Sequence, residues 1–286
     1  MAHGLPTQEE LDTMNNEWIE PYDAATAPAG FEYALYETKS RGASTQGSYW
    51  YKLPEGYSPD KKYPVLIWLH GGMSRAGRDA HMVRDHYVEG MVKGKMPPTI
   101  LVLPQALPVG WYLNSIDNKF LIEDVMVKDF IPHIDATFSV AEGLRGIEGF
   151  SMGGYGAAHL GFKFPHLFRA VSPVAAAILP SLSMEPKERV WDTFRDSQEY
   201  YDACHPRTLL KQNKEQLQAA TLRVRLLSGG DDVRLADAIE VLSQLMTEAH
   251  IVHYRKDIAG AGHEYDMIVK GLGEEAWDFW KQAFEA

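Results

Sequence analysis

Short apolar runs alternate with helix-like segments along most of this chain. The runs predict strands at 64–69, 99–103, 144–150, 168–174, 222–228 and 251–257. Two further segments, 31–39 and 48–53, are expected to pair antiparallel at one edge of the same sheet. Alternation of this kind indicates an α/β fold, with a mostly parallel central sheet of about eight strands flanked by helices.

Three segments stand apart from this alternation. Residues 1–28 are polar, with Pro and Ala, and are expected to form an arm that lies over the domain. Residues 178–220 are an insertion with helix-like character, which forms either a small cap over the carboxyl edge of the sheet or ordinary packed helices. The last segment, 273–285, has its aromatic residues at core-facing helical spacing. No repeat or linker divides residues 29–286, which predicts a single domain.

The composition of the chain mainly excludes classes of structure and function. The chain has 286 residues, 45% of them hydrophobic, which is enough for one large domain with a substantial core. A net charge of −11 without a basic block disfavours binding to nucleic acid or to an anionic membrane. Cys204 is the single cysteine, so no internal disulfide forms, and no apolar run is long enough to span a membrane. The first residues lack the features of a signal peptide, so we expect a cytoplasmic protein or a mature secreted form without its leader.

Residues 149–154, Gly-Phe-Ser-Met-Gly-Gly, are the most informative segment of the chain. They follow a predicted strand and open a helical stretch of small residues, which is the strand–turn–helix context of a nucleophile elbow. In such a turn the serine adopts a strained backbone conformation, so that its hydroxyl projects above the sheet. Gly149 and Gly153 flank Ser151 where any Cβ is expected to collide with the neighbouring strand or helix. The segment therefore predicts Ser151 as a nucleophile.

A candidate acid and a candidate base follow Ser151, each after a later strand, in the order serine, acid, histidine. The predicted strand at 222–228 leads to Gly-Gly-Asp-Asp, and the predicted strand at 251–257 leads to His263. Ser151, Asp232 and His263 should therefore meet at the carboxyl edge of one parallel sheet. One of two such aspartates commonly serves as a turn residue or helix cap, and we favour Asp232 over Asp231 as the acid. His263 would carry the serine proton, and the carboxylate would fix its tautomer.

Nucleophilic attack by a serine on a carbonyl group also requires two backbone N–H groups, which stabilise the oxyanion of the tetrahedral intermediate. The N–H of Met152, directly after the serine, is one candidate. Gly72 is the other, because the predicted strand at 64–69 is followed by His-Gly-Gly, the pattern of an oxyanion loop. Trp111 and Tyr112 follow the fourth strand beside the elbow and are the expected substrate-binding residues. No metal or nucleotide motif occurs, so neither a metal nor a cofactor is expected.

Four segments together resemble a known family. They are residues 69–72 (Leu-His-Gly-Gly), 111–115 (Trp-Tyr-Leu-Asn-Ser), 129–135 (Asp-Phe-Ile-Pro-His-Ile-Asp) and 145–154 (Arg-Gly-Ile-Glu-Gly-Phe-Ser-Met-Gly-Gly). The chain resembles the esterase D / feruloyl esterase branch of the α/β-hydrolase superfamily over residues 45–284. The elbow and the Ile-Pro-x-Ile helix are fairly specific to this branch, whereas the other segments are generic to the superfamily.

The resemblance implies an α/β-hydrolase that acts as a serine carboxylesterase on a small-molecule ester, without a cofactor, through an acyl-enzyme. An aromatic, feruloyl-type acyl group is one expectation, because Trp111 and Tyr112 could stack on it. A thioesterase of the S-formylglutathione hydrolase type, or an acyltransferase, would share the chemistry up to the acyl-enzyme and stays open. A non-catalytic binding protein that retains the fold is the alternative from another class. The oligomeric state is not indicated.

Two groups of charged residues need separate explanations. Glu148 stands in the strand that enters the elbow, where the family usually has a small apolar residue. A buried carboxylate is costly unless it is paired, so we expect Glu148 to pair with Arg145 or a histidine, with tuning of the triad as the alternative. Four basic residues follow His-Gly-Gly: Arg75, Arg78, His81 and Arg84. We expect these to be solvated charges, with binding of a substrate carboxylate as the alternative.

Overall fold

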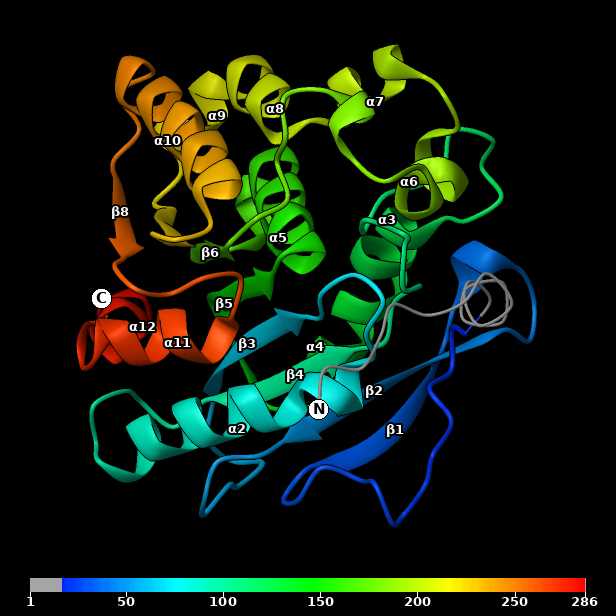
Figure 1. Ribbon diagram of the computed structural model, residues 1–286. Helices are drawn as coiled ribbons and strands as arrows, with labels where there is room; N and C mark the ends of the chain where they lie inside the picture. Colours follow the sequence, from blue (N-terminus) through cyan, green and yellow to red (C-terminus); the bar gives the residue numbers. More distant parts are fainter. Residues whose placement is uncertain (1–16, 286) are drawn as a thin grey trace.

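One sheet organises the fold in the computed structural model, which describes residues 17–285. Within them, eight strands lie in the order β1-β2-β4-β3-β5-β6-β7-β8 (Figure 1). β2 is antiparallel to both β1 and β4, whereas the remaining neighbours run parallel. The predicted sheet and its antiparallel edge are thus confirmed. The strands are β1 (Glu32–Glu37), β2 (Gln46–Lys52), β3 (Tyr63–Leu69), β4 (Ile100–Pro104), β5 (Val140–Phe150), β6 (Ala170–Val174), β7 (Arg223–Gly229) and β8 (His253–Ile258).

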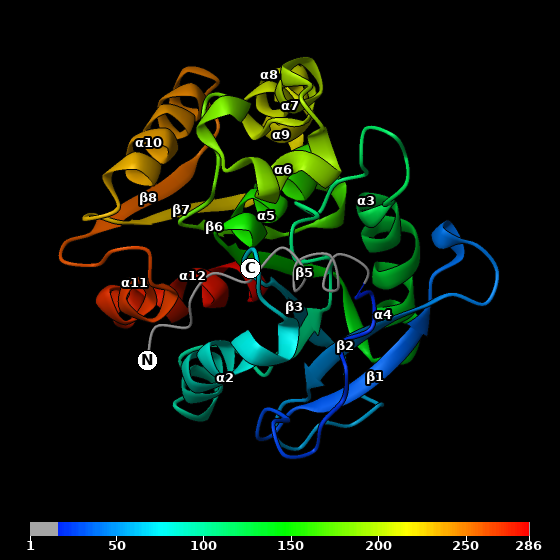
Figure 2. The same ribbon diagram turned by 45° about the vertical axis from the view of Figure 1, so that its right-hand side comes forward.

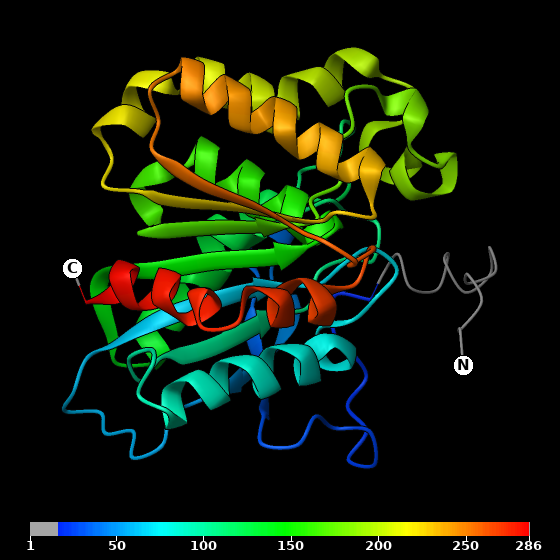
Figure 3. The same ribbon diagram turned by 60° about the vertical axis from the view of Figure 1, so that its left-hand side comes forward.

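Helices cover both faces of this sheet (Figure 3). One face carries α2 (Ala76–Val92), α11 (Tyr265–Leu272) and α12 (Glu275–Phe284). The other carries the continuous segment α3 (Ile122–Asp124), η2 (Val125–Phe130) and α4 (Ile131–Thr137), and then α5 (Met152–Lys163) and α10 (Val233–Glu248). Two short 3-10 turns are η1 (Lys39–Arg41) and η3 (Pro165–Leu167). The architecture is therefore three layers, with the sheet in the middle.

The strand β3 shows why its sequence is apolar at every position. Val65, Ile67 and Leu69 pack into the hydrophobic cluster on the α5 side, whereas Leu66 and Trp68 pack into the cluster on the α2 side. Side chains alternate along a strand, so each residue of a central parallel strand faces one helix layer or the other. All seven residues of β3 are buried accordingly.

The insertion at 178–220 is helical (Figure 2). It forms η4 (Leu182–Met184), α6 (Lys187–Phe194), α7 (Gln198–Cys204), α8 (Pro206–Gln212) and α9 (Lys214–Ala219). Phe194 and Tyr201 are buried in it, and the Tyr201 hydroxyl donates to the Leu179 carbonyl at 2.7 Å. Helix α8 packs against α5, so much of the insertion extends that helical layer. A role as a cap stays a prediction, as does the single-domain division.

The expected arm is described only from residue 17 onward, and residues 1–16 lie outside the described residues. Trp18 is buried, and its carbonyl accepts from the N–H of Ser48 at 3.2 Å. The N–H of Glu20 donates to the Ser48 hydroxyl at 2.8 Å. This segment is therefore attached to β2.

The turn after β5 confirms that glycine is required on both sides of Ser151. Ser151 has φ 57° and ψ −113°, a conformation that residues with side chains rarely adopt. A Cβ on Gly149 would lie 2.2 Å from the carbonyl oxygen of Gly153, and a Cβ on Gly153 would lie 2.1 Å from that of Leu69. Both distances are far below van der Waals contact. Helix α5 can therefore approach β3 and β5 this closely only through glycine.

Glu148 lies fully buried beneath the elbow, at the centre of a polar network. Across the sheet, Ser172 of β6 and Arg225 of β7 donate to its Oε2 at 2.7 and 3.0 Å. From the helix layer, Tyr87 of α2 and Tyr265 of α11 donate to its Oε1 at 2.5 and 2.6 Å. Burial and then the Glu148 charge raise the pKa of both tyrosines well above the usual value, so they remain donors. Four side chains thus compensate one buried carboxylate.

The expected pairing of Glu148 with Arg145 or a histidine is wrong, since its partners are Tyr87, Ser172, Arg225 and Tyr265. For Arg145, the geometry of β5 explains why. The two residues are three positions apart, so their side chains point to opposite faces of the sheet. Arg145 pairs with Asp135 of α4 at 2.5 Å. Glu148 is in register with Ser172, and Arg225 reaches it across β6 from the same face.

Replacing Gly153 with Ala should lower the free energy of unfolding by about 3 kcal/mol, because the new Cβ would meet backbone oxygens that cannot move aside. Gly262→Ala is the matched control, since its added Cβ would meet no atom closer than 3.9 Å. Chemical denaturation of both variants measures the difference. Equal stabilities would contradict the close approach of α5 to β3.

Glu148→Ala should cost about 3–5 kcal/mol of stability, because it leaves the buried Arg225 guanidinium without its carboxylate. The comparison is Asp135→Ala, which breaks an ion pair whose carboxylate is 44% exposed and should cost about 1 kcal/mol or less. Urea titrations of the two variants give both values. If Glu148→Ala were no more costly than Asp135→Ala, the network would not be what joins the sheet to α2 and α11.

Candidate active site

Three loops at the carboxyl edge of the sheet bring Ser151, Asp232 and His263 together. Ser151 follows β5 directly, Asp232 lies between β7 and α10, and His263 lies between β8 and α11. The His263 Nε2 is 2.9 Å from the Ser151 Oγ, and its Nδ1 is 2.7 Å from the Asp232 Oδ2. With its proton on Nδ1, the imidazole donates to the carboxylate and accepts from the serine hydroxyl. The three residues therefore form one hydrogen-bonded chain.

The structure also distinguishes the two adjacent aspartates. Asp232 occupies the N-cap position of α10 but makes no capping bond, and its carboxylate accepts from His263 instead. Asp231 is exposed, and its N–H donates to the Ala261 carbonyl at 2.9 Å. A Cβ on Gly229 would lie 2.1 Å from the Gly262 carbonyl oxygen. The backbone that leads to Asp232 is therefore in direct contact with the backbone that leads to His263. This contact fixes the distance between them.

Two backbone N–H groups beside Ser151 have no hydrogen-bond partner in the described part of the chain. Gly72 and Met152 both line the pocket that holds Ser151, and neither N–H donates a hydrogen bond within residues 17–285. A Cβ on Gly72 would lie 3.6 Å from the Met152 Cβ, so the two residues are adjacent. The next N–H along the loop, that of Met73, already donates to the Pro108 carbonyl at 2.8 Å. Gly72 is therefore the donor that this loop leaves available.

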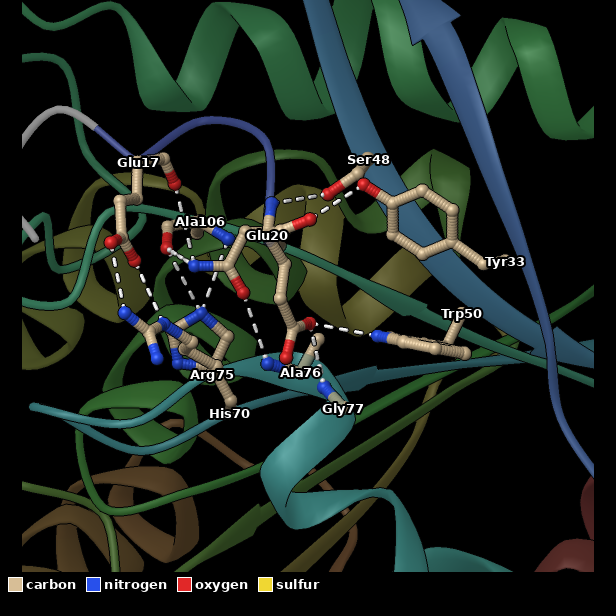
Figure 4. Close-up of polar contacts among 11 residues, drawn as sticks. Glu17, Glu20, Tyr33, Ser48, Trp50, His70, Arg75, Ala76, Gly77 and Ala106 are labelled. Atoms are coloured by element: carbon tan, nitrogen blue, oxygen red, sulfur yellow. Dashed lines mark hydrogen bonds and ion pairs between the residues drawn. The ribbon is translucent and has the colours of Figure 1, made fainter. Parts of the chain in front are cut away.

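The buried His70, whose contacts with Ala106 are drawn in Figure 4, fixes the backbone of the loop that contains Gly72. The His70 Nδ1 donates to the Gly71 carbonyl at 2.8 Å, and its Nε2 accepts from the Ala106 N–H at 3.1 Å. Gln105 accepts from the Ala76 N–H at 3.0 Å and donates to the Ala106 carbonyl at 2.9 Å. These bonds join the loop after β3, the start of α2 and the loop after β4 into one unit.

The segment before β1 is bonded to the same unit (Figure 4). The Glu20 carboxylate accepts from the Trp50 indole and from the Gly77 N–H, both at 2.8 Å. Burial raises the Glu20 pKa, and these two hydrogen bonds oppose the shift. Arg75 makes two hydrogen bonds with Glu17, each of 2.8 Å, so it is already paired. Arg75 and the three other basic residues of its segment line a separate hollow, not the pocket that holds Ser151.

The pocket in front of Ser151 has a volume of about 250 Å³. Trp111 lines it, as expected, and its indole N–H donates to the Arg189 carbonyl at 2.7 Å. Tyr112 is fully buried, and its hydroxyl donates to the His70 carbonyl at 3.1 Å. The structure therefore places Tyr112 behind the oxyanion loop, and the expectation that it contacts substrate is corrected. The apolar part of the wall consists of Met73, Pro108, Val109, Trp111, Met152, Ala177 and Leu235.

Three charged residues in the pocket wall were missed by the sequence analysis. Glu185 and Arg189 come from the start of the insertion, and Arg234 comes from the first turn of α10. No motif surrounds them. The helical pattern of the insertion does not reveal which of its turns faces the serine, so no signal in the sequence could have identified them.

Within residues 17–285, no cluster of three or more His, Cys, Asp or Glu side chains is arranged to hold a metal ion. In the same part of the chain, no helix has the length and apolar character needed to cross a membrane.

Solved structures with the same fold include two ferulic acid esterases and an S-formylglutathione hydrolase. A ferulic acid esterase is 22% identical, with a TM-score of 0.73 over 89% of this chain and 99% of that chain. A ferulic acid esterase from Anaeromyces mucronatus, in complex with ferulic acid, is 17% identical, with a TM-score of 0.63 over 94% and 95%. An S-formylglutathione hydrolase from Agrobacterium tumefaciens is 14% identical, with a TM-score of 0.69 over 89% and 96%. At these identities the likeness establishes the α/β-hydrolase fold alone.

Sequence relatives and a family model agree with this fold. An esterase of Mycobacterium tuberculosis is 32% identical over 130 residues, which are 42% of this chain and 27% of that protein. An Aspergillus terreus protein named “Probable feruloyl esterase C” is 27% identical over 130 residues, or 44% and 45% of the two chains. The chain thus spans less than half the length of these relatives. The Esterase family model, described as “Putative esterase”, matches residues 48–286, so the chain belongs to the Esterase family of α/β-hydrolases.

Proposed function

We propose that this chain is a serine carboxylesterase, with Ser151 as nucleophile, His263 as general base and Asp232 as the acid that orients it. The proposal rests on the hydrogen-bonded chain from the Ser151 Oγ through both ring nitrogens of His263 to Asp232, at 2.9 and 2.7 Å. A serine on a strained turn, with a histidine in reach and a carboxylate behind it, is the arrangement that acyl transfer requires. Membership of the Esterase family supports the same reaction.

In the first half of the proposed reaction, the Ser151 Oγ attacks the ester carbonyl carbon while the His263 Nε2 takes its proton. The negative charge moves to the carbonyl oxygen, where the N–H groups of Gly72 and Met152 donate to it. His263 then returns the proton to the departing alcohol, and the acyl group remains on Ser151. In the second half, water gives a proton to His263 and attacks the acyl carbon; the bond to the Ser151 Oγ then breaks, His263 returns the proton to that oxygen, and the acid is released.

We further propose that an aromatic acyl group can lie against Trp111. The indole is held by its bond to Arg189, so it offers a fixed ring face or edge at the pocket wall. Solved structures named as ferulic acid esterases share this fold, which supports the idea. Trp111 carries this proposal without Tyr112, since that ring lies outside the pocket.

The proposed reaction depends on the hydroxyl of Ser151. The protein should hydrolyse at least one ester among p-nitrophenyl acetate, butyrate and octanoate, methyl ferulate and S-formylglutathione. Ser151→Ala should lower kcat by about 10⁴-fold or more, because the nucleophile is gone. Turnover of S-formylglutathione alone would instead indicate a thioesterase, and acyl transfer to an added alcohol in preference to water would indicate an acyltransferase. Absence of both turnover and labelling by a fluorophosphonate would point to a non-catalytic binding protein.

The two adjacent aspartates allow a matched test of the proposed acid. Asp232→Asn should lower kcat by about 10⁴-fold, because an amide cannot hold the imidazole in the required tautomer. Asp231→Asn removes the same charge from an exposed neighbour and should leave kcat almost unchanged. Steady-state kinetics of both variants on one ester, with circular dichroism to verify folding, measure the effect. Similar kcat values for the two would remove Asp232 from the mechanism.

A further inference from the structure

Two opposite charges, Glu185 and Arg189, lie in the wall of the pocket that holds Ser151. Within residues 17–285, neither side chain makes a hydrogen bond or an ion pair. The Glu185 Oε1 and the Arg189 Nε are both shielded from solvent without a partner. The third charge of the wall, Arg234, donates to the Met184 carbonyl at 3.4 Å.

These charges influence one another without touching. Burial raises the pKa of the Glu185 carboxyl, and the positive charges of Arg234 and Arg189 oppose that shift. A direct ion pair between Glu185 and Arg189 would satisfy both groups, yet none is formed. Partly buried polar groups without partners are rare in folded proteins, because each loses its bonds to water and gains nothing in return. Both residues line the pocket, so a ligand that enters it could bond to the rest of each charged group and offset part of this cost.

The backbone that carries Arg189 is held in place, so this part of the wall is built rather than loose. The Trp111 indole donates to the Arg189 carbonyl at 2.7 Å. On the same helix, the Thr193 hydroxyl donates to the Val109 carbonyl at 3.1 Å, and the Thr193 carbonyl accepts from the Ile116 N–H at 2.9 Å. Helix α6 is therefore fixed to the loop after β4, which also lines the pocket.

The pair of opposite charges selects the kind of group that can bind between them. A carboxylate on the substrate would be attracted by Arg189 and repelled by Glu185, and an ammonium group would meet the reverse. A hydroxyl group is neutral, donates one hydrogen bond and accepts others. It can donate to the Glu185 carboxylate and accept from the Arg189 guanidinium at the same time, so it is the group that satisfies both.

We propose that Glu185 and Arg189 form a subsite for a hydroxyl group of the ester, so that the protein prefers hydroxylated substrates over matched esters that lack the hydroxyl. This proposal rests on the proposed esterase function, because the subsite shares its pocket with Ser151. A site that hydrogen-bonds a substrate hydroxyl rejects the analogue without it, since its own polar groups are then left unsatisfied. The hydroxyl belongs either to the alcohol part, as in a glycerol or sugar ester, or to the acyl part, as in a phenolic acid.

Two matched pairs of esters distinguish these sources. Glyceryl monoacetate and propyl acetate differ in hydroxyls on the alcohol side, and methyl 4-hydroxycinnamate and methyl cinnamate differ in one hydroxyl on the acyl side. For one pair, the wild-type kcat/KM should favour the hydroxylated ester by about 10-fold or more. Glu185→Gln and Arg189→Met should each reduce that ratio to about 2-fold or less, mainly through loss of kcat/KM on the hydroxylated ester.

Glu188→Gln is the control, since it removes a carboxylate from the exposed surface of the same helix and should keep the ratio. Equal loss of activity on both members of a pair would indicate a merely structural role and overturn the proposal. An unchanged ratio in both variants, or no preference in the wild type, would also overturn it. Calorimetric binding of glyceryl monoacetate and of methyl 4-hydroxycinnamate to Ser151→Ala, with and without Glu185→Gln, separates the subsite from the chemistry. Binding that depends on Glu185, together with no turnover of any ester by the wild type, would refute the esterase and retain the subsite. Binding of neither compound would refute the subsite.

Discussion

The contact between helix α5 and strands β3 and β5 is the constraint on which the candidate active site depends. The helix lies so close to the strands that a single Cβ on Gly149 or Gly153 would overlap a backbone oxygen. The chain can turn this sharply only with Ser151 at φ 57°. Such strain persists only where the surroundings enforce it. Here every residue from Met152 to Phe162 is buried, so packing of α5 holds the turn.

The Glu148 network lies directly below this turn and reaches both ends of the proposed triad. Glu148 is three residues before Ser151, and its partner Tyr265 is two residues after His263. The Phe150 ring lies between them, with its centroid 4.7 Å from that of His263 and 5.9 Å from that of Tyr265. One buried carboxylate thus connects the strand that carries the serine to the helix that follows the histidine. Its hydrogen bonds with four side chains offset the cost of burying its charge.

The reacting groups and the pocket wall come from different parts of the fold. The proposed serine, histidine and aspartate and the two N–H groups stand on turns at the carboxyl ends of parallel strands of the sheet. The wall is assembled from the loop after β4, the start of the insertion and the first turn of α10. Loops of this kind vary without disturbing the sheet, so chemistry and substrate choice can be separated in such a fold.

The sequence by itself determined the layered fold and the positions of the proposed reacting residues. Alternation of strands and helices, and glycine at positions where a Cβ cannot fit, are local properties that leave a direct pattern. The tertiary structure alone decided the partners. Arg225, 77 residues from Glu148, replaced the expected Arg145. Packing also placed Tyr112 behind the pocket, turned Asp232 toward His263, and brought Glu185 into the wall of the pocket that holds Ser151. Periodicity reports the face on which a side chain lies, but its partner depends on how distant segments pack.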